Sequence, residues 1–221
     1  MRTAAILPVK LFAEAKQRLG GAVAEDLRRD LARAMVGDVL AALERARLVQ
    51  CTIVVTSEAQ ASEPARAHGA VVVPDSACAG QSAAVQLGVA RALADGFDRV
   101  LCVPGDCPAL DPGEVDELLR GAGAGPGVVV IPDRHGTGTN GLLLTPPDAI
   151  EPGFGPGSCE RHQARAREAG LACEVAPVPS LLLDVDTGSD LSALRDRLAS
   201  SPGGAGGTRA VLGASPVTTA A

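Results

Sequence analysis

The chain has 221 residues, of which 46% are hydrophobic, but its only aromatic residues are three phenylalanines. A hydrophobic fraction of this size predicts a packed core and excludes a disordered protein, while the scarcity of rings argues against a surface that stacks single-stranded nucleic acid. The net charge is −6. A protein that binds a nucleic-acid backbone usually carries an excess of basic residues instead, so no nucleic-acid partner is expected.

The apolar stretches are all far shorter than the roughly 20 residues of a membrane-spanning helix, and the N-terminal one is too short for a secretory signal. We therefore expect a soluble, cytoplasmic protein with no membrane partner. Six cysteines are present, but no two form a C-x-x-C pair, so neither a zinc site nor a disulfide framework is predicted.

Strands and helices are expected to alternate along the chain. The first half predicts a strand at residues 4–9, a helix at 25–47, a strand at 51–56, a short helix at 64–68, a strand at 70–73, a helix from about residue 80 and a strand at 99–103. The second half predicts a helix that starts at Asp111-Pro112-Gly113-Glu114, strands at 128–131 and 141–145, a helix at 158–169, strands at 173–178 and 181–185, and a helix at 190–198.

The predicted strands are continuously apolar, which indicates a sheet covered on both faces. Together with the alternation of elements, this predicts the α/β class, with three layers around a mostly parallel, mixed sheet. One domain is expected over residues 1–200. From Ser201 onward the sequence is rich in Gly, Ala, Ser, Thr and Pro without periodicity, so residues 201–221 are predicted to form a disordered tail.

Ligands of open α/β sheets bind at the carboxyl ends of the strands, so the polar residues after each strand are the first candidates for a site. After the first strand come Lys10, Lys16 and Arg18. Fixed positive charge suits a triphosphate, because it offsets the charge that moves onto a departing pyrophosphate. An ordinary solvated loop is the alternative that these residues leave open.

Carboxylates occur at two other places of this kind. Asp106 lies in the turn after the strand at 99–103, and Asp184 and Asp186 follow the apolar run at 181–183. A carboxylate at a strand end is a hard oxygen ligand suited to Mg²⁺, and the second stretch can supply a second ligand. One of Asp184 and Asp186 would face the site while the other caps the next helix. A plain turn aspartate and a plain helix cap are the alternatives.

Glycine-rich segments supply further candidates. Gly80-Gln81-Ser82 precedes a helix and offers free backbone amides to an anion or a base edge. Residues 136–141 match G-x-G-x-x-G, but they lead into a strand where the dinucleotide fingerprint needs a helix. We interpret them as a donor-rich loop beside Arg134 that suits a phosphate or carboxylate. Ser158 would cap a helix, donate to an acceptor phosphate, or do both.

Several segments occur in the order Ile6-Leu7-Pro8-Val9-Lys10, Ala15-Lys16, Arg18-Leu19, Gly105-Asp106-Cys107-Pro108, Gly138-Thr139-Asn140 and Asp184-Val185-Asp186-Thr187. In this order they resemble the guanylyltransferases of coenzyme F-420 biosynthesis, the phosphoenolpyruvate or 2-phospho-L-lactate guanylyltransferase family. The resemblance covers about residues 3–198. It implies a GT-A-like nucleotidyltransferase domain that uses GTP and Mg²⁺.

The same resemblance implies roles for individual residues. Those implied to be catalytic are Lys10, Lys16, Arg18 and Asp106, and Asp106 with Asp184 or Asp186 would hold the metal. Those implied to bind the nucleotide are Leu7, Pro8, Val9, Lys10, Gly80, Gln81 and Ser82. Those implied to bind the phosphorylated acid are Thr139, Gly155 and Ser158. A downstream deazaflavin transferase is the implied partner for the product, and a homodimer stays open.

The resulting hypothesis is that a phosphate oxygen of the acid attacks the α-phosphorus of GTP and displaces pyrophosphate. Phosphoenolpyruvate is the favoured acid, because the Ala-, Arg- and Gly-rich composition is typical of GC-rich actinobacterial genomes, where the resemblance implies that substrate. The alternatives are 2-phospho-L-lactate, 3-phospho-D-glycerate and a molybdenum-cofactor guanylyl- or cytidylyltransferase. A glycosyltransferase and a catalytically silent nucleotide-binding regulator are less favoured.

Overall fold

The computed structural model describes residues 1–13, 16–19, 24–201 and 203–214. Seven strands form one sheet in the order β3-β2-β1-β4-β6-β5-β7. Strand β6 runs antiparallel to its neighbours β4 and β5, while the other neighbouring strands are parallel. The strands are β1 (Thr3–Val9), β2 (Cys51–Thr56), β3 (Val71–Pro74), β4 (Arg99–Cys102), β5 (Gly127–Pro132), β6 (Thr139–Thr145) and β7 (Ala172–Val175).

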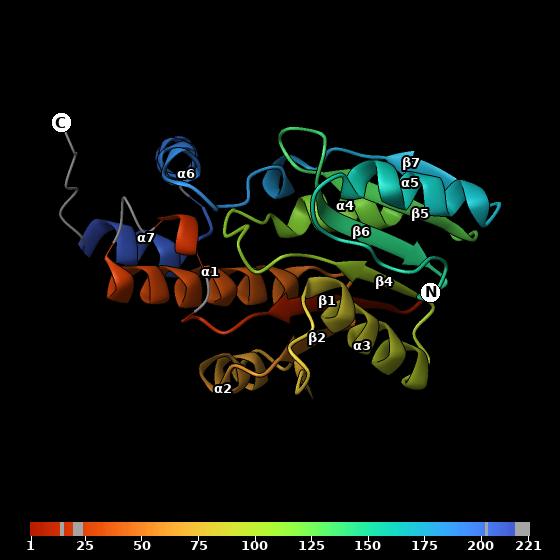
Figure 1. Cartoon of the computed structure of the whole chain (residues 1–221), viewed down its shortest axis with the longest axis horizontal. Coiled ribbons are helices and arrows are strands. Elements are labelled where there is room, and N and C mark those ends of the chain that lie inside the picture. The colour runs from red at the N-terminus through yellow and green to blue at the C-terminus, as the bar shows by residue number, and fades with distance from the viewer. Residues whose placement is uncertain (14–15, 20–23, 202, 215–221) are drawn as a thin grey trace.

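Helices cover both faces of this sheet (Figure 1). On one face pack α1 (Glu25–Arg45), α2 (Ala59–Ala67) and α4 (Pro112–Gly121), and on the other pack α3 (Gln81–Ala94) and α5 (Ser158–Glu168). In β1, Ala5 and Leu7 are buried on the first face, while Ala4 and Ile6 are buried on the second. Because successive strand residues point to opposite faces, such a strand must be apolar throughout. The predicted three-layer, mostly parallel α/β class is confirmed.

The carboxyl ends of the parallel strands meet at one edge of the sheet. Val9, the last residue of β1, pairs with Thr56, the last residue of β2, and Ile6 pairs with Cys102 at the end of β4. Because β6 runs the opposite way, its first residue, Thr139, lies at this same edge. The edge therefore collects the loops after β1, β2 and β4 together with the start of β6.

The strand predicted at residues 181–185 is wrong. Pro179–Leu181 forms a short 3-10 helix, η2, and the residues after it are irregular. The preceding strand, β7, ends at Val175. Pro177 and Pro179 lack the backbone N–H that a sheet ladder needs, which explains why the chain leaves the sheet here.

Side-chain caps set the starts of α4 and α2. Asp111 accepts hydrogen bonds from the backbone N–H of Gly113 and Glu114, which confirms the predicted start of α4. Helix α2 begins at Ala59, earlier than predicted, because the Glu58 carboxylate accepts a hydrogen bond from its first turn. Among the described residues, no helix combines the length and apolarity needed to cross a membrane.

The predicted disordered tail from Ser201 is wrong for part of its length. Gly206–Ala214 forms helix α7, which packs against α1 (Figure 1). The Asp38 carboxylate of α1 accepts hydrogen bonds from the backbone N–H of Gly207 and Thr208, so it satisfies two donors at the start of α7. Side chains of α7, α1 and α6 (Gly188–Ser200) share a small core. Residues 215–221 lie outside the described part of the chain.

Candidate active site

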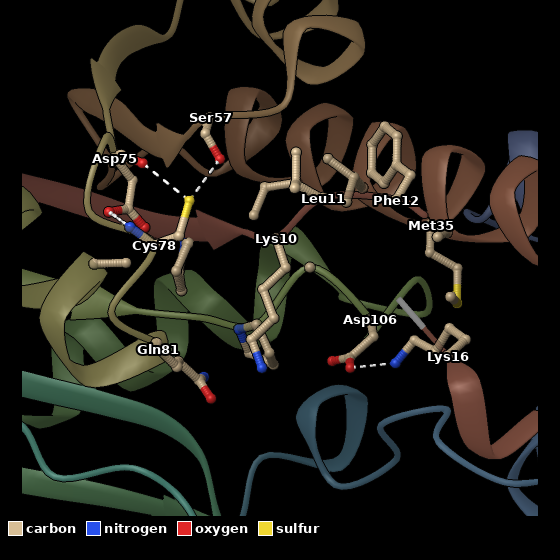
Figure 2. A pocket seen from close by; sticks show the side chains of 18 of the residues that line it. Lys10, Leu11, Phe12, Lys16, Met35, Ser57, Asp75, Cys78, Gln81 and Asp106 are labelled. Carbon is tan, nitrogen blue, oxygen red and sulfur yellow. Dashed lines mark hydrogen bonds and ion pairs between the residues drawn. The ribbon is translucent and has the colours of Figure 1, made fainter. Parts of the chain in front are cut away.

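A cavity of roughly 400 Å³ opens at the carboxyl edge of the sheet. Its wall includes one polar residue after each of four parallel strands: Lys10 after β1, Ser57 after β2, Asp75 after β3 and Asp106 after β4 (Figure 2). Side chains from α1 and α3 complete much of the wall. This convergence follows from the topology, because parallel strands deliver their following loops to the same edge.

Asp106 lies in the tight turn that follows β4. The turn needs Gly105, since a Cβ there would lie 2.9 Å from Cγ2 of Val36 on α1. The Asp106 Oδ2 atom accepts a hydrogen bond from Lys16 Nζ at 2.5 Å. The Oδ1 atom is buried and has no hydrogen-bond partner among the described residues. A buried carboxylate oxygen without a donor is costly, so it fits a ligand for a cation better than a structural turn residue.

Lys16 connects Asp106 to Asp186, a carboxylate from the segment that precedes α6. Its Nζ lies 2.5 Å from Asp106 Oδ2 and 3.1 Å from Asp186 Oδ1, and its side chain is only 7% exposed. Burial lowers the pKa of Lys16, but the charges of Asp106 and Asp186 outweigh that effect and hold the pKa above its ordinary value. The ammonium therefore stays charged and bridges two carboxylates that would otherwise repel each other. Figure 2 shows its contact with Asp106.

The stretch from Asp184 to Asp186 also meets Asp106 through the backbone. Val185 N donates a hydrogen bond to the Asp106 carbonyl oxygen at 3.2 Å. Asp184 Oδ1 accepts a hydrogen bond from Asn140 Nδ2 at 3.2 Å. Burial, together with the charge of nearby Asp106, raises the pKa of Asp184. Three carboxylates from two distant stretches therefore gather at one place.

Neither Asp184 nor Asp186 caps the helix that follows them, in contrast to the sequence prediction. Thr187 is the N-cap of α6, and it forms a reciprocal capping box with Asp190. Thr187 does the capping because its hydroxyl accepts from the third residue of the helix, whose carboxylate bonds back to Thr187 N. Asp186 is thereby left to contact Lys16 and to line the cavity.

The donor set fits a magnesium ion that shares its coordination with a substrate. In the described chain, no three His, Cys, Asp or Glu side chains are placed to hold a metal ion by themselves. Mg²⁺ usually takes one or two protein carboxylates and completes its coordination with water and substrate phosphates. Asp106, whose Oδ1 has no partner in the described chain, and Asp186 meet that requirement. Both contact the same ammonium group of Lys16, so they lie close enough together to share one cation.

Five of the residues predicted to contact the nucleotide line the cavity: Pro8, Val9, Lys10, Gly80 and Gln81. Lys10 is exposed and makes no ion pair within the described residues, so its charge is available to an anionic ligand. Gly80 precedes α3 with a φ of 98°, a conformation that favours glycine. The first amides of α3 have no acceptor within the helix, so they too can meet an anion.

Two other predicted residues, Leu7 and Ser82, do not line this wall. Leu7 is fully buried in the core and does not line the cavity. Ser82 Oγ accepts a hydrogen bond from Phe154 N at 2.9 Å, so it joins α3 to the loop before α5. Arg18 belongs to the short 3-10 helix η1 (Gln17–Leu19), but its side chain lies outside the described residues.

The residues predicted to bind the acceptor do not line the cavity. Thr139 begins β6, Ser158 begins α5, and Gly155 lies in the loop before α5 with a φ of 110°. Gly157 is the N-cap of α5, so the alternative that Ser158 caps this helix is wrong. Ser158 Oγ is instead buried without a hydrogen-bond partner in the described chain.

In the glycine-rich loop before β6, several of the donors that the sequence offers to an anion are already paired within the protein. The Asp133 carboxylate accepts hydrogen bonds from the backbone N–H of His135 and Thr137. Arg134 forms an ion pair with Asp190 of the α6 capping box. These donors and the cation of the loop are already paired, so the loop acts as a turn that leads into β6.

His162 of α5 is a buried polar residue for which the sequence predicts no role. Its Nε2 accepts a hydrogen bond from Gly153 N at 2.9 Å, and its Nδ1 lies 3.0 Å from Thr139 Oγ1. The side chain is fully buried. Burial, helped by the charges of Arg165 and Arg161, lowers the pKa of His162 to about 4. The imidazole is therefore neutral at pH 7.

We expect His162 to make the stability of the protein sensitive to acid. Its pKa falls from an ordinary 6.5 to about 4 on folding, so between these values the unfolded chain binds a proton that the folded protein does not. The free energy of unfolding should fall as the pH drops through this range, and His162→Gln should lose that part of the pH dependence. Urea unfolding of both proteins measures it, and equal pH slopes would contradict the expectation.

Three polar residues of the cavity wall were missed by the sequence analysis: Ser57, Asp75 and Cys78. Cys78 Sγ lies 3.2 Å from Ser57 Oγ, and Cys78 N donates to Asp75 Oδ1 at 3.0 Å (Figure 2). The strand-end rule that pointed to Lys10 and Asp106 would have found Ser57 and Asp75, had it been applied to β2 and β3. Cys78 lies farther beyond its strand, where no such rule applies.

Comparison with known protein sequences gives a consistent set of matches. Residues 3–195 match the family model described as "Guanylyl transferase CofC like". The chain is 53% identical to the phosphoenolpyruvate guanylyltransferase of Conexibacter woesei over 213 residues, which cover 96% of each chain. It is 40% identical to the protein of the same name from Sphaerobacter thermophilus over 194 residues, which cover 88% of this chain and 93% of that one.

A solved structure from Desulfovibrio desulfuricans G20, classed with the nucleotide-diphospho-sugar transferases, has a similar fold. It superimposes with a TM-score of 0.76 and covers 96% of this chain and 94% of that one. At 21% sequence identity, this likeness shows the fold alone. The GT-A-like fold that the sequence resemblance implies is thereby confirmed.

Proposed function

This chain belongs to the CofC-like guanylyl transferase family and is a nucleotidyltransferase, and we propose that it joins GTP to phosphoenolpyruvate. The products are enolpyruvoyl-diphospho-guanosine and pyrophosphate. The relative that is 53% identical and named for this acceptor supports the choice of acid. We place the reaction in coenzyme F-420 biosynthesis in the cytoplasm, with a deazaflavin-specific transferase as the recipient of the product. A homodimer stays a prediction.

The contact of Lys16 with both Asp106 and Asp186 is the observation that carries this proposal. An ammonium that bridges two carboxylates marks a place where a divalent cation can be shared by them. Lys10 and the start of α3 border the same cavity and can take the negative charge of a triphosphate. The cavity thus combines an acidic side for a metal ion with donors for phosphate oxygens.

In the proposed reaction, a phosphate oxygen of the acid bonds to the α-phosphorus of GTP while the bond to the pyrophosphate oxygen breaks. A phosphate monoester dianion is already a nucleophile, so no side chain has to remove a proton. The protein contributes positioning and charge neutralisation, for which Lys10 and the α3 amides are placed. Mg²⁺ held by Asp106 and Asp186 would offset the charge of the triphosphate.

Ser158→Ala is expected to weaken acceptor binding without a cost in stability. Ser158 Oγ has no partner among the described residues, so its removal strands no other group and the free energy of unfolding should stay equal or rise. A hydrogen bond lost to a charged phosphate should raise the KM of the acid about tenfold, with the KM of GTP unchanged. Kinetics with each substrate varied, together with urea unfolding, measure both. A less stable protein would assign Ser158 to the structure instead.

The proposed function is tested by incubating the full chain with GTP, Mg²⁺ and one acid at a time while following pyrophosphate release. The acids to compare are phosphoenolpyruvate, 2-phospho-L-lactate and 3-phospho-D-glycerate, and molybdopterin tests the molybdenum-cofactor alternative. CTP in place of GTP is the control for the base. We expect release to be fastest with GTP and phosphoenolpyruvate. Release that needs no acid, or that occurs with none of these acids, would refute the proposal.

A further inference from the structure

We propose that His162 is a positioning residue, which directs the Thr139 hydroxyl group toward the phosphorylated acid. This inference rests on the proposed function, since it takes Thr139 as a contact of the acceptor. His162 itself touches neither substrate in this proposal. It acts through its two hydrogen bonds, one to β6 and one to the loop that precedes α5.

The hydrogen bonds of the ring assign its protonation. Nε2 lies 2.9 Å from the backbone nitrogen of Gly153, and a backbone N–H can only donate, so Nε2 carries no proton. A neutral imidazole then has its proton on Nδ1. Because Nδ1 lies 3.0 Å from Thr139 Oγ1, the Nδ1–H group donates to that oxygen. The low pKa of His162 keeps the ring in this neutral form at pH 7.

This donation frees the hydroxyl proton of Thr139. The oxygen already accepts from His162, so its own proton points elsewhere, and the described residues include no acceptor for it. Thr139 is buried, so water does not readily satisfy this donor. A buried O–H group with an unused proton is suited to an anionic oxygen of a phosphate or carboxylate. With the opposite tautomer, Thr139 would donate to the ring and have no proton for a ligand.

Ser158 places a second unused hydroxyl in the same region. Ser158 and His162 are four residues apart in α5, so they lie on the same face of the helix, one turn from each other. Ser158 Oγ is buried and has no partner in the described chain. Since His162 contacts Thr139, the Thr139 hydroxyl lies beside the first turns of α5, the helix that begins at Ser158. Two buried donors there suit an acceptor rich in anionic oxygens.

The surroundings of His162 hold its ring in a fixed direction. Phe154 packs against the ring edge-on, with the two ring centroids 5.2 Å apart. The backbone N–H of Phe154 donates to Ser82 Oγ at the start of α3. Arg161 fixes the same loop by donating to the carbonyl oxygens of Gly153 and Pro156. His162 therefore occupies a rigid position between β6, α5 and the helix that borders the nucleotide cavity.

Two substitutions separate the two hydrogen bonds of the ring. In His162→Asn the side-chain amide can still donate toward Thr139, while in His162→Gln the longer side chain can still accept from Gly153. We expect His162→Gln to raise the KM of phosphoenolpyruvate about tenfold or more with the KM of GTP unchanged, and His162→Asn to raise it less. The matched control is His68→Gln at the end of α2, where His68 pairs with Glu44, and it should leave every kinetic constant unchanged.

A double-mutant cycle tests whether His162 acts through Thr139. In a Thr139→Val background, His162→Gln should cause no further rise in the KM of the acid, because both changes act on one hydroxyl group. Additive effects of the two substitutions would overturn the inference. Nitrogen NMR of the wild-type protein with labelled histidine should show Nδ1 protonated and Nε2 unprotonated. The opposite tautomer would overturn it as well.

Failure of this inference is distinguishable from failure of the proposed function. A wild-type protein that releases no pyrophosphate from GTP and phosphoenolpyruvate would remove the proposed function, and the acceptor contact of Thr139 with it. A wild-type protein that turns over, while His162→Gln raises the KM of GTP as much as that of the acid, would refute the positioning role alone. The same holds if His162→Gln leaves the KM of the acid unchanged.

Discussion

Asp106→Asn is expected to lower kcat by roughly 10²- to 10³-fold or more while leaving the protein folded. The substitution removes the charge of a carboxylate that contacts Lys16 at 2.5 Å and whose second oxygen is buried without a partner in the described chain. If Asp106 helps to hold Mg²⁺ against the triphosphate, its charge acts where negative charge shifts during the reaction. Loss of that charge therefore affects the chemical step more than the fold.

Asp111→Asn is the matched control for this substitution. Asp111 caps α4 with its carboxylate, and Asn caps helices about as well as Asp, so the control should keep the wild-type kcat and stability. Steady-state kinetics at saturating GTP and Mg²⁺, with circular dichroism to verify folding, compare the two variants. An Asp106→Asn enzyme with a kcat within a few-fold of the wild type would make Asp106 a structural turn residue.

Lys16→Met is expected to act in opposite directions on metal binding and on catalysis. In the free protein the ammonium bridges Asp106 and Asp186, where we place the cation, so it has to move before the metal binds. Removal of the ammonium should therefore raise the affinity of the free protein for Mn²⁺ about tenfold or more. Once displaced, the ammonium is available to the triphosphate, so its loss should lower kcat/KM for GTP by about 10²-fold or more.

Lys10→Met is the matched control for Lys16→Met, because it removes the same charge from a different place in the cavity wall. Lys10 borders the same cavity but makes no ion pair in the described part of the chain, so its removal should weaken GTP binding without changing Mn²⁺ affinity. Electron paramagnetic resonance during a Mn²⁺ titration measures the affinity of each free protein. If Lys16→Met binds Mn²⁺ no more tightly than Lys10→Met does, the ammonium does not occupy the place of the cation.

Much of the fold could be predicted because its signals are local. Strand β1 is apolar from Ala4 to Val9 because both of its faces are buried, and the Asp111-Pro112 pair marks the start of α4. Helix α7 could not be predicted, because its sequence is rich in Gly and Ala and carries little pattern of its own. Its start depends on hydrogen bonds to Asp38, which lies far away in the sequence.

The acidic part of the candidate site follows partly from topology. Asp106 could be assigned to the ligand-binding edge because it follows a parallel strand. Asp186 reaches the same place for another reason. It lies in the irregular segment after η2, directly beyond the strand that the sequence predicts at residues 181–185, and the hydrogen bond from Val185 N to the Asp106 carbonyl oxygen fixes that segment.

The remaining contacts of the site depend on tertiary structure. The sequence shows that Lys16 is a cation, but not whether it meets a carboxylate or a phosphate. The contact of His162 with Thr139 arises because β6 begins beside α5, and no spacing in the sequence records that meeting. Residues of this kind were therefore missed, or their contacts within the protein were not predicted.

Anomalous diffraction from crystals grown with Mn²⁺ and a non-hydrolysable GTP analogue locates the cation on which the proposed reaction depends. We predict an anomalous peak between Asp106 and Asp186, with Lys16 Nζ moved from its bridging position toward the phosphates. A peak elsewhere, or Lys16 still bridging both carboxylates with the nucleotide bound, would contradict this assignment.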